Sequence, residues 1–184
     1  LMVSILIPTY NYSVIALVEE LFKQAESTSG SIEIIVCDDA STMLDVSNMC
    51  LKFAKKMSIV SGAKKNSIKT INQDVQKKIP LKDNSLDGLL LGEIIEHLSK
   101  GKKVMKELSK KVKKDAICYF STPANGPAED HVLLFKNVKE IRKFIKDCSW
   151  KIVKDSPITL SNMSVKYAEE NFKVINYCAI LKKK

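Results

Sequence analysis

Short apolar runs alternate with amphipathic helical patterns along almost the whole chain, and this alternation constrains the fold more than any other feature. Strand-like runs are predicted at residues 3–8, 32–38, 67–72, 86–91, 116–121, 150–155 and 172–181. Helical patterns are predicted at residues 14–26, 47–57, 102–113 and 138–148. Strands that alternate with helices usually pair in parallel, so the order predicts a doubly wound, Rossmann-like α/β fold with a mostly parallel sheet of about seven strands.

The end of the chain departs from this regularity around residues 157–170, which favours a hairpin-like ending with an antiparallel C-terminal strand. A length of 184 residues allows one substantial core and is short for two full catalytic domains. Residues 123–127, rich in Pro, Asn and Gly, are interpreted as a loop after a strand and not as a linker. We therefore expect residues 1–184 to form a single Rossmann-like domain.

The net charge of +9 comes from lysines spread along the chain, and Arg142 is the only arginine. Proteins that read phosphates and bases usually depend on the bidentate guanidinium group of arginine. The charge is therefore interpreted as a solvated lysine surface, and nucleic acid is not a predicted partner.

The cysteines and the first residues indicate where the protein works. The five cysteines, Cys37, Cys50, Cys118, Cys148 and Cys178, lack the paired spacing of a metal site. Several lie in apolar strand-like runs, which predicts buried thiols in a reducing, cytoplasmic environment. The opening LMVSILIPTYN is apolar but short, and we interpret it as a buried strand and not as a signal peptide or a membrane span.

Acidic side chains follow the second and third predicted strands, where a doubly wound sheet places its ligand crevice. A carboxylate there can accept hydrogen bonds from both hydroxyls of a ribose, and Asp38, Asp39 and Asp45 are candidates for that role. The alternative for Asp45 or Ser47 is to cap the following helix. Asp74 can accept a hydrogen bond from an exocyclic amine such as that of adenine, or it can be a turn residue.

Two histidines lie in loops that follow later strands. The segment GEIIEHL places Glu93, Glu96 and His97 after the fourth strand, where His97 is a general base, a metal ligand or a structural hydrogen-bonding residue. His131 follows the fifth strand beside Asp130, which can orient its imidazole, so His131 is a candidate active-site base. HxxH, HExxH and CxxC spacings are absent from the sequence, and no metal is predicted.

From residue 45 to the end, the chain resembles a class I S-adenosylmethionine-dependent methyltransferase of the group that modifies small molecules and sugars. The resemblance lies in an ordered series of segments: DVSNMCLKFAKK, INQDV, IPLKDNSLDGLLLGEIIEHL, KVMKELSKKVKKDAICYFSTPA and NGPAEDHVLLF. It implies S-adenosylmethionine as cofactor and a hydroxyl of a small molecule or sugar as acceptor. The residue roles that it implies are Asp39 or Asp45 on ribose, Asp74 on adenine, Gly92 and Glu93 beside the methionine, and His131 with Asp130 as the base.

Residues 1–42 resemble the start of a family 2 glycosyltransferase, through VSILIPTYN and IEIIVCDDAST. That resemblance implies contacts with a uridine-type nucleotide from Pro8, Thr9, Tyr10, Asn11 and Asp38 or Asp39. A methyltransferase opens with a glycine-rich loop, whereas the loop here, IPTYNYS, has no glycine. The chain therefore resembles a chimera. Impaired cofactor binding, a nucleotide-sugar binding module and a folded protein without activity are the alternatives.

Overall fold

The computed structural model of the chain describes residues 3–4, 32–33, 42–45, 47–60, 69–159 and 163–184. The chain divides into two compact units, Leu1–Asp74 and Val75–Lys184, each with its own strands and helices. A single domain over residues 1–184 stays a prediction.

The first unit contains two pairs of parallel strands. Strand β1 (Val3–Ser4) pairs with β2 (Ile32–Glu33), and β3 (Thr42–Asp45) pairs with β4 (Lys69–Asn72). Helix α2 (Asn48–Val60) lies between β3 and β4 in the chain. A strand, a helix and a parallel strand form a βαβ unit, although its first strand is β3 and not the predicted strand at residues 32–38.

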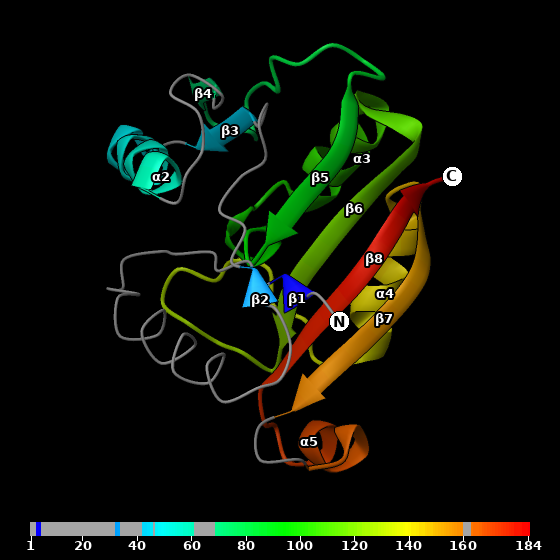
Figure 1. The fold of residues 1–184 in the computed structure, drawn as a ribbon. Coiled ribbons are helices and arrows are strands. Elements are labelled where there is room, and N and C mark those ends of the chain that lie inside the picture. The colour runs from blue at the N-terminus through cyan, green and yellow to red at the C-terminus, as the bar shows by residue number, and fades with distance from the viewer. Residues whose placement is uncertain (1–2, 5–31, 34–41, 46, 61–68, 160–162) are drawn as a thin grey trace. The chain divides into compact units, whose positions relative to one another are not determined.

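The second unit contains a four-stranded sheet with the order β5-β6-β8-β7 (Figure 1). The strands are β5 (Leu86–Gly92), β6 (Val112–Ala124), β7 (Trp150–Thr159) and β8 (Ile175–Lys183). The helices are η1 (Ile95–His97), α3 (Gly101–Lys111), α4 (Val138–Asp147) and α5 (Val165–Glu170). Strands β5 and β6 are parallel, and β8 runs antiparallel to both of its neighbours, as the irregular ending of the sequence predicts.

The α/β class is confirmed, but the arrangement of the sheet is described only in part. Pairing among the described strands gives three separate sheets of two, two and four strands, so one continuous sheet of about seven strands stays a prediction. The sequence predicts a loop at residues 38–45, and this is wrong for residues 42–45, which form β3. A strand of four residues is too short for its alternation to be distinguished from a loop.

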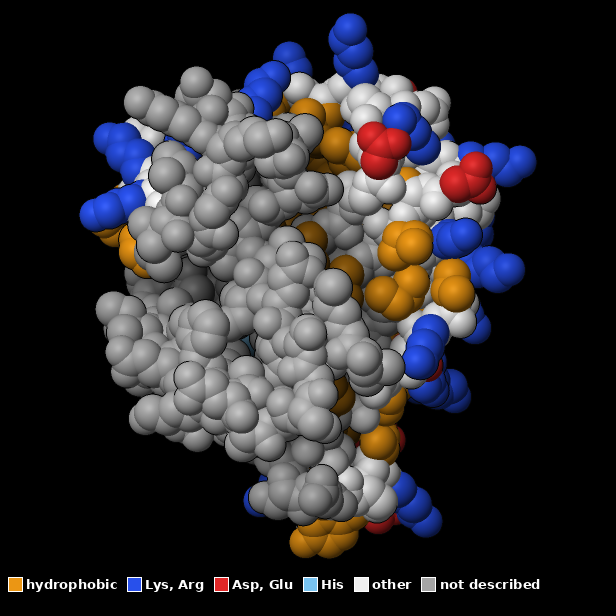
Figure 2. All heavy atoms as spheres, in the orientation of Figure 1, with side chains coloured by type: hydrophobic (Ala, Val, Ile, Leu, Met, Phe, Trp, Pro, Cys, Tyr) orange, Lys and Arg blue, Asp and Glu red, His pale blue; other side chains and the backbone are white. Residues whose placement is uncertain are grey.

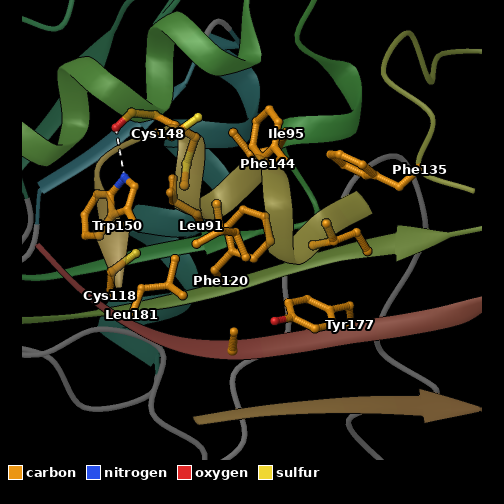
Figure 3. Close-up of a cluster of buried hydrophobic side chains, with 14 of the residues drawn as sticks. Leu91, Ile95, Cys118, Phe120, Phe135, Phe144, Cys148, Trp150, Tyr177 and Leu181 are labelled. Atoms are coloured by element: carbon orange, nitrogen blue, oxygen red, sulfur yellow. Dashed lines mark hydrogen bonds between the residues drawn. The ribbon is translucent and has the colours of Figure 1, made fainter. Parts of the chain in front are cut away.

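The core of the second unit lies between the sheet and helices α3 and α4 (Figure 3). Each helix buries one stripe of apolar side chains: Val104, Met105 and Leu108 from α3, and Val138, Ile141, Phe144 and Ile145 from α4. On β6, Cys118 and Phe120 are fully buried beneath them, and burial raises the pKa of the Cys118 thiol to about 12. The predicted burial of Cys118 is thus confirmed, and its thiol is unreactive at neutral pH.

The other face of this sheet also carries apolar side chains. Ile117 on β6 lies between two buried residues and is 52% exposed, and Leu90 on β5 lies beside the buried Leu91 and is 47% exposed. Figure 2 shows hydrophobic side chains gathered on the molecular surface, with lysines around them. Apolar residues on both faces are typical of parallel strands that helices cover on both sides.

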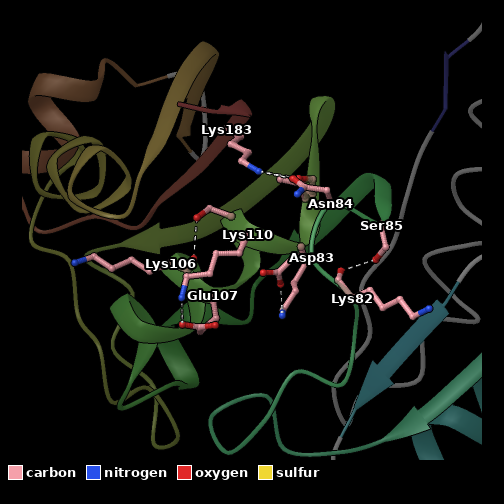
Figure 4. Close-up of polar contacts among 11 residues, drawn as sticks. Lys82, Asp83, Asn84, Ser85, Lys106, Glu107, Lys110 and Lys183 are labelled. Carbon is pink, nitrogen blue, oxygen red and sulfur yellow. Dashed lines mark hydrogen bonds and ion pairs between the residues drawn. The ribbon is translucent and has the colours of Figure 1, made fainter.

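A turn before β5 donates hydrogen bonds to the last carbonyl groups of α3, and its residues are drawn in Figure 4. The backbone N–H groups of Asn84 and Ser85 donate to the carbonyl oxygens of Lys110 and Lys111, at 2.9 and 2.8 Å. Asn84 adopts a left-handed backbone with φ of 52°, which asparagine tolerates better than most residues. The Asp-Asn-Ser sequence therefore closes the last turn of the helix, whose carbonyl groups would otherwise lack donors.

Helix α4 begins with a reciprocal cap. The side-chain oxygen of Asn137 accepts a hydrogen bond from the backbone N–H of Glu140 at 2.9 Å. The Glu140 carboxylate in turn accepts from the backbone N–H of Lys136 at 2.8 Å. Two donors that the helix itself cannot satisfy are paired in this way.

We expect Asn137→Ala to lower the free energy of unfolding by about 1 kcal/mol, because the Glu140 N–H loses its acceptor. Urea unfolding followed by circular dichroism measures this change. Asn137→Ser is the matched control, since serine also accepts from the third residue of a helix. Equal losses in the two variants would show that the cap contributes little.

Candidate functional site

In the first unit, the carboxyl ends of β3 and β4 bring two predicted ligand residues to one edge. Asp45 is the last residue of β3 and lies opposite Asn72, the last residue of β4. The backbone N–H of Gln73 donates to the Asp45 carbonyl oxygen at 3.0 Å, and Asp74 is the next residue along the chain. Both acidic residues therefore follow parallel strands at the edge where ligands bind in such sheets.

The two alternatives for Asp45 and Ser47 are compatible in the structure. The Ser47 hydroxyl accepts from the backbone N–H of Cys50 at 3.2 Å, so Ser47 caps α2. Asp45 Oδ1 accepts from the Ser47 backbone N–H at 2.6 Å. A carboxylate offers about four lone-pair positions on two oxygens, so this contact leaves acceptor capacity for a ribose.

In the second unit, the chain turns sharply where β5 ends. Gly92 lies opposite Ser121 on β6, and the backbone N–H of Glu93 donates to the Ser121 carbonyl oxygen at 3.1 Å. Glu93 has a φ of 49°, in the left-handed region that glutamate rarely adopts. This conformation directs the chain from the strand into the short helix η1, which carries Glu96 and His97.

Glu96 is the most unusual charged group among the described residues, because it is only 1% exposed. Its Oε2 atom accepts a hydrogen bond from the hydroxyl of Thr122, also fully buried, at 2.9 Å. Its Oε1 atom has no hydrogen-bond partner in the described part of the chain. Burial, together with the nearby charge of Glu93, raises the pKa of Glu96 to about 7.

Two imidazoles lie beside this carboxylate. The rings of His97 and His131 meet edge to face, with their centroids 4.8 Å apart. His97 Nδ1 lies 3.2 Å from both the carbonyl oxygen and Oδ2 of Asp130. His131 Nδ1 lies 2.6 Å from the Gly126 carbonyl oxygen. Because a carbonyl oxygen only accepts, Nδ1 of each ring donates, and Nε2 carries the lone pair of the neutral imidazole.

The loop after β6 is fixed against η1 by backbone contacts. The N–H groups of Val132 and Leu133 donate to the carbonyl oxygen of Glu96 at 2.8 and 2.9 Å. A Cβ atom added to Gly126 would lie 2.7 Å from Cβ of Pro123, so only glycine fits there without a shift. The Gly126 carbonyl that His131 contacts is therefore positioned by a tight turn.

The structure brings His131, Glu96 and His97 together, but it pairs Asp130 differently from the prediction. We expect Asp130 to orient its neighbour His131, whereas the structure pairs Asp130 with His97. Residues 129–130 form a turn, in which the backbone N–H of His131 donates to the Ala128 carbonyl oxygen, so proximity in sequence does not determine the contact. The sequence analysis also missed Thr122 and Gly126, since the sequence gives no signal for contacts between distant segments.

The remaining predicted site residues cannot be placed. Asp38 and Asp39, and the nucleotide-contact candidates Pro8, Thr9, Tyr10 and Asn11, lie outside the described residues. The proposed glycosyltransferase-like contacts therefore stay predictions.

The described strands and helices define an α/β protein, with acidic residues at the carboxyl ends of the parallel strands β3 and β4 and an antiparallel C-terminal strand. Comparison with known families is more specific. A family model described as a methyltransferase domain matches residues 18–120, which is more than half of the chain. The chain belongs to this methyltransferase family.

Solved structures agree with the fold. The chain is similar to the cyclase SpnF, with a TM-score of 0.62, 11% identity, and coverage of 96% of this chain and 84% of that chain. The MccD protein gives a TM-score of 0.62, 11% identity, and coverage of 79% and 80%. A SAM dependent methyltransferase from Aquifex aeolicus gives a TM-score of 0.53, 14% identity, and coverage of 97% and 81%. Among curated proteins, no sequence matches this chain.

The family match begins at residue 18, so it includes part of the segment that resembles a glycosyltransferase. The resemblance to a methyltransferase is thus confirmed by a match over residues 18–120, and S-adenosylmethionine is the cofactor that the family implies. Asp45 and Asp74 fit such a group chemically, because their carboxylates lie at or just after the carboxyl ends of β3 and β4 and can accept hydrogen bonds from hydroxyl or amine donors. No described helix has the length and apolar character needed to cross a membrane.

Proposed function

We propose that this protein transfers the methyl group of S-adenosylmethionine to a hydroxyl of a small molecule or sugar. Membership of the methyltransferase family supports the methyl transfer. The observation that carries the choice of a hydroxyl is the group of Glu96, His97 and His131. Transfer to a hydroxyl requires removal of a proton, and these side chains can assist that removal.

On the cofactor side, Asp45 binds the ribose and Asp74 binds the adenine amine. Asp45 has acceptor capacity beyond its contact with the Ser47 N–H. Gly92 and Glu93, at the carboxyl end of β5, lie beside the methionine portion in this proposal. Asp39 is the second candidate for the ribose.

On the acceptor side, His131 accepts the proton of the hydroxyl. Its Nδ1 donates to the Gly126 carbonyl, so its Nε2 lone pair is the basic position. Asp130 Oδ2 lies 3.2 Å from Nδ1 of His97 and orients that ring. The His97 ring in turn contacts the ring of His131. When bound, the cofactor supplies an electrophilic methyl carbon on a sulfonium. The methyl group would pass to the acceptor oxygen, and His131 would hold the proton that the hydroxyl releases.

Binding of S-adenosylhomocysteine, measured by isothermal titration calorimetry, tests the cofactor side without an acceptor. We expect micromolar binding to the full chain and binding about 10- to 100-fold weaker in Asp45→Asn and Asp74→Ala, because hydrogen bonds to a charged carboxylate are lost. Asparagine keeps an acceptor for the Ser47 N–H, so Asp45→Asn leaves the turn before α2 in place. Asp115→Ala is the control, because Asp115 is an exposed acid at the amino end of β6.

The same titration tests the finer hypotheses. Absence of binding at millimolar S-adenosylhomocysteine would contradict the proposed function and support impaired binding by the glycine-free loop. Binding of uridine diphosphate in its place would favour a nucleotide-sugar binding module of chimeric origin. Absence of binding by either ligand would favour a folded protein without activity.

A further inference from the structure

We propose that Glu96, His97 and His131 bind a divalent first-row transition-metal cation, which positions the acceptor hydroxyl. These three side chains each offer one ligand atom, and the atoms all lie within 4.8 Å of one another. Glu96 and His97 come from η1, and His131 comes from the loop after β6. The role of the cation in positioning the acceptor hydroxyl rests on the proposed function. Binding of the cation to the three side chains does not depend on that function.

The first argument is the unpaired oxygen of Glu96. The side chain is 1% exposed, one oxygen is bonded to Thr122, and the other has no hydrogen-bond partner among the described residues. A buried carboxylate needs a compensating charge, and the neighbouring acidic side chain of Glu93 makes the charged form of Glu96 still less favourable. A cation coordinated by Oε1 supplies that compensation, and Thr122 fixes the orientation of the group. The site therefore holds a buried oxygen without a hydrogen-bond partner among the described residues, next to a second acidic side chain.

The second argument is the orientation of the two imidazoles. Metal-bound histidines usually donate their other ring N–H to a carboxylate or a backbone carbonyl, which fixes the tautomer and the direction of the lone pair. His97 Nδ1 faces Asp130, and His131 Nδ1 faces the Gly126 carbonyl. In both rings the basic atom is then Nε2. This arrangement of outer contacts is that of a metal site, although the sequence lacks the usual spacing of metal ligands.

The ligand types select the ion. Two imidazoles and one carboxylate suit Zn²⁺ and its first-row neighbours, and they do not suit Mg²⁺ or Ca²⁺, which prefer oxygen ligands. Ligand atoms about 2.1 Å from a tetrahedral Zn²⁺ lie about 3.4 Å apart, so the side chains approach one another slightly on binding. Three protein ligands leave a coordination position for another molecule, as in catalytic zinc sites.

That position suits the oxygen of the acceptor. A coordinated hydroxyl loses its proton to water more readily, and its oxygen remains the nucleophile for the methyl group. With the cation bound, the Nε2 lone pair of His131 coordinates the metal and cannot accept the proton of the acceptor hydroxyl. The metal instead makes that hydroxyl more acidic, so its proton passes to water. An acceptor with a second oxygen next to its hydroxyl, such as a vicinal diol of a sugar, can bind the cation through both oxygens.

The test is titration of the full chain with Zn²⁺ after treatment with EDTA and removal of the chelator. We expect one Zn²⁺ per chain with a micromolar or lower Kd, and binding at least 30-fold weaker in Glu96→Gln and His131→Ala. Asp130→Asn is expected to weaken binding 10- to 100-fold, because it alters only the outer contact of His97. Glu129→Gln, an exposed neighbour in the same loop, is expected to leave the Kd unchanged.

Co²⁺ titration identifies the ligands directly. Visible absorption without a thiolate charge-transfer band is expected in the parent chain and is expected to be lost in His131→Ala. Circular dichroism confirms that each variant remains folded. Absence of binding, binding that the Glu96 and His131 variants do not change, or a thiolate band would overturn the proposed site. Titration of S-adenosylhomocysteine in EDTA tests the proposed function separately, so the two proposals can fail independently.

Discussion

Replacement of Trp150 by alanine is expected to lower the free energy of unfolding by about 4 kcal/mol. Trp150 is the first residue of β7 and is fully buried between the sheet and the helices (Figure 3). Its indole Nε1 donates to the carbonyl oxygen of Met105 in α3 at 3.0 Å. The substitution therefore leaves a large cavity and also removes a buried hydrogen bond between a helix and the sheet.

Urea unfolding measured by far-ultraviolet circular dichroism tests this expectation, since the chain has one tryptophan and its fluorescence disappears in the variant. Trp150→Phe keeps an aromatic ring but loses the hydrogen bond, so we expect a loss about half as large. Phe172→Ala is the matched control, because Phe172 is 83% exposed and its removal is expected to change stability by about 0.5 kcal/mol or less. A similar loss in Phe172→Ala and Trp150→Ala would contradict the account of the core.

The four strands and the helices α3 and α4 of the second unit were predictable because burial and periodicity agree there, whereas the short helices η1 and α5 were not predicted. Helix α4 has its apolar residues on one stripe, and the observed Val138–Asp147 differs from the prediction by one residue. Strand β6 is longer than the predicted 116–121 at both ends, because Val112 pairs with Leu86 of β5 before a shift in register and residues 122–124 pair with β8. Pairing with a neighbouring strand, and not local composition, determined those boundaries.

The candidate site was only partly predictable, since it depends on contacts between distant segments. The rule that ligands bind at the carboxyl ends of parallel strands selected the loop after β5, where the structure places Glu96 and His97 in contact range of His131. It could not determine that Thr122 donates to Glu96, because the two residues belong to different strand ends. It also could not determine that Asp130 contacts His97 instead of His131. Such pairings arise from the path of the loop in three dimensions.

Between pH 4.5 and pH 7, the free energy of unfolding is expected to fall by about 3 kcal/mol as pH rises, because of Glu96 alone. Burial, and then the nearby charge of Glu93, raises the pKa of Glu96 from 4.5 to about 7 in the folded protein. In this pH range the unfolded chain releases the proton while the folded chain keeps it. Stability is therefore greatest below the unfolded pKa and is lost as pH rises through the folded pKa.

Urea unfolding at a series of pH values in EDTA measures this slope for the metal-free protein. In Glu96→Gln the contribution should disappear, since glutamine keeps an acceptor for the Thr122 hydroxyl but carries no titrating group. Glu129→Gln should retain the slope, because Glu129 is exposed. If the parent chain and Glu96→Gln lose stability equally between pH 4.5 and 7, the carboxyl of Glu96 is not buried as the structure places it. If the slope disappears only in Glu96→Gln, the charged form of this buried carboxyl lowers the stability of the folded protein.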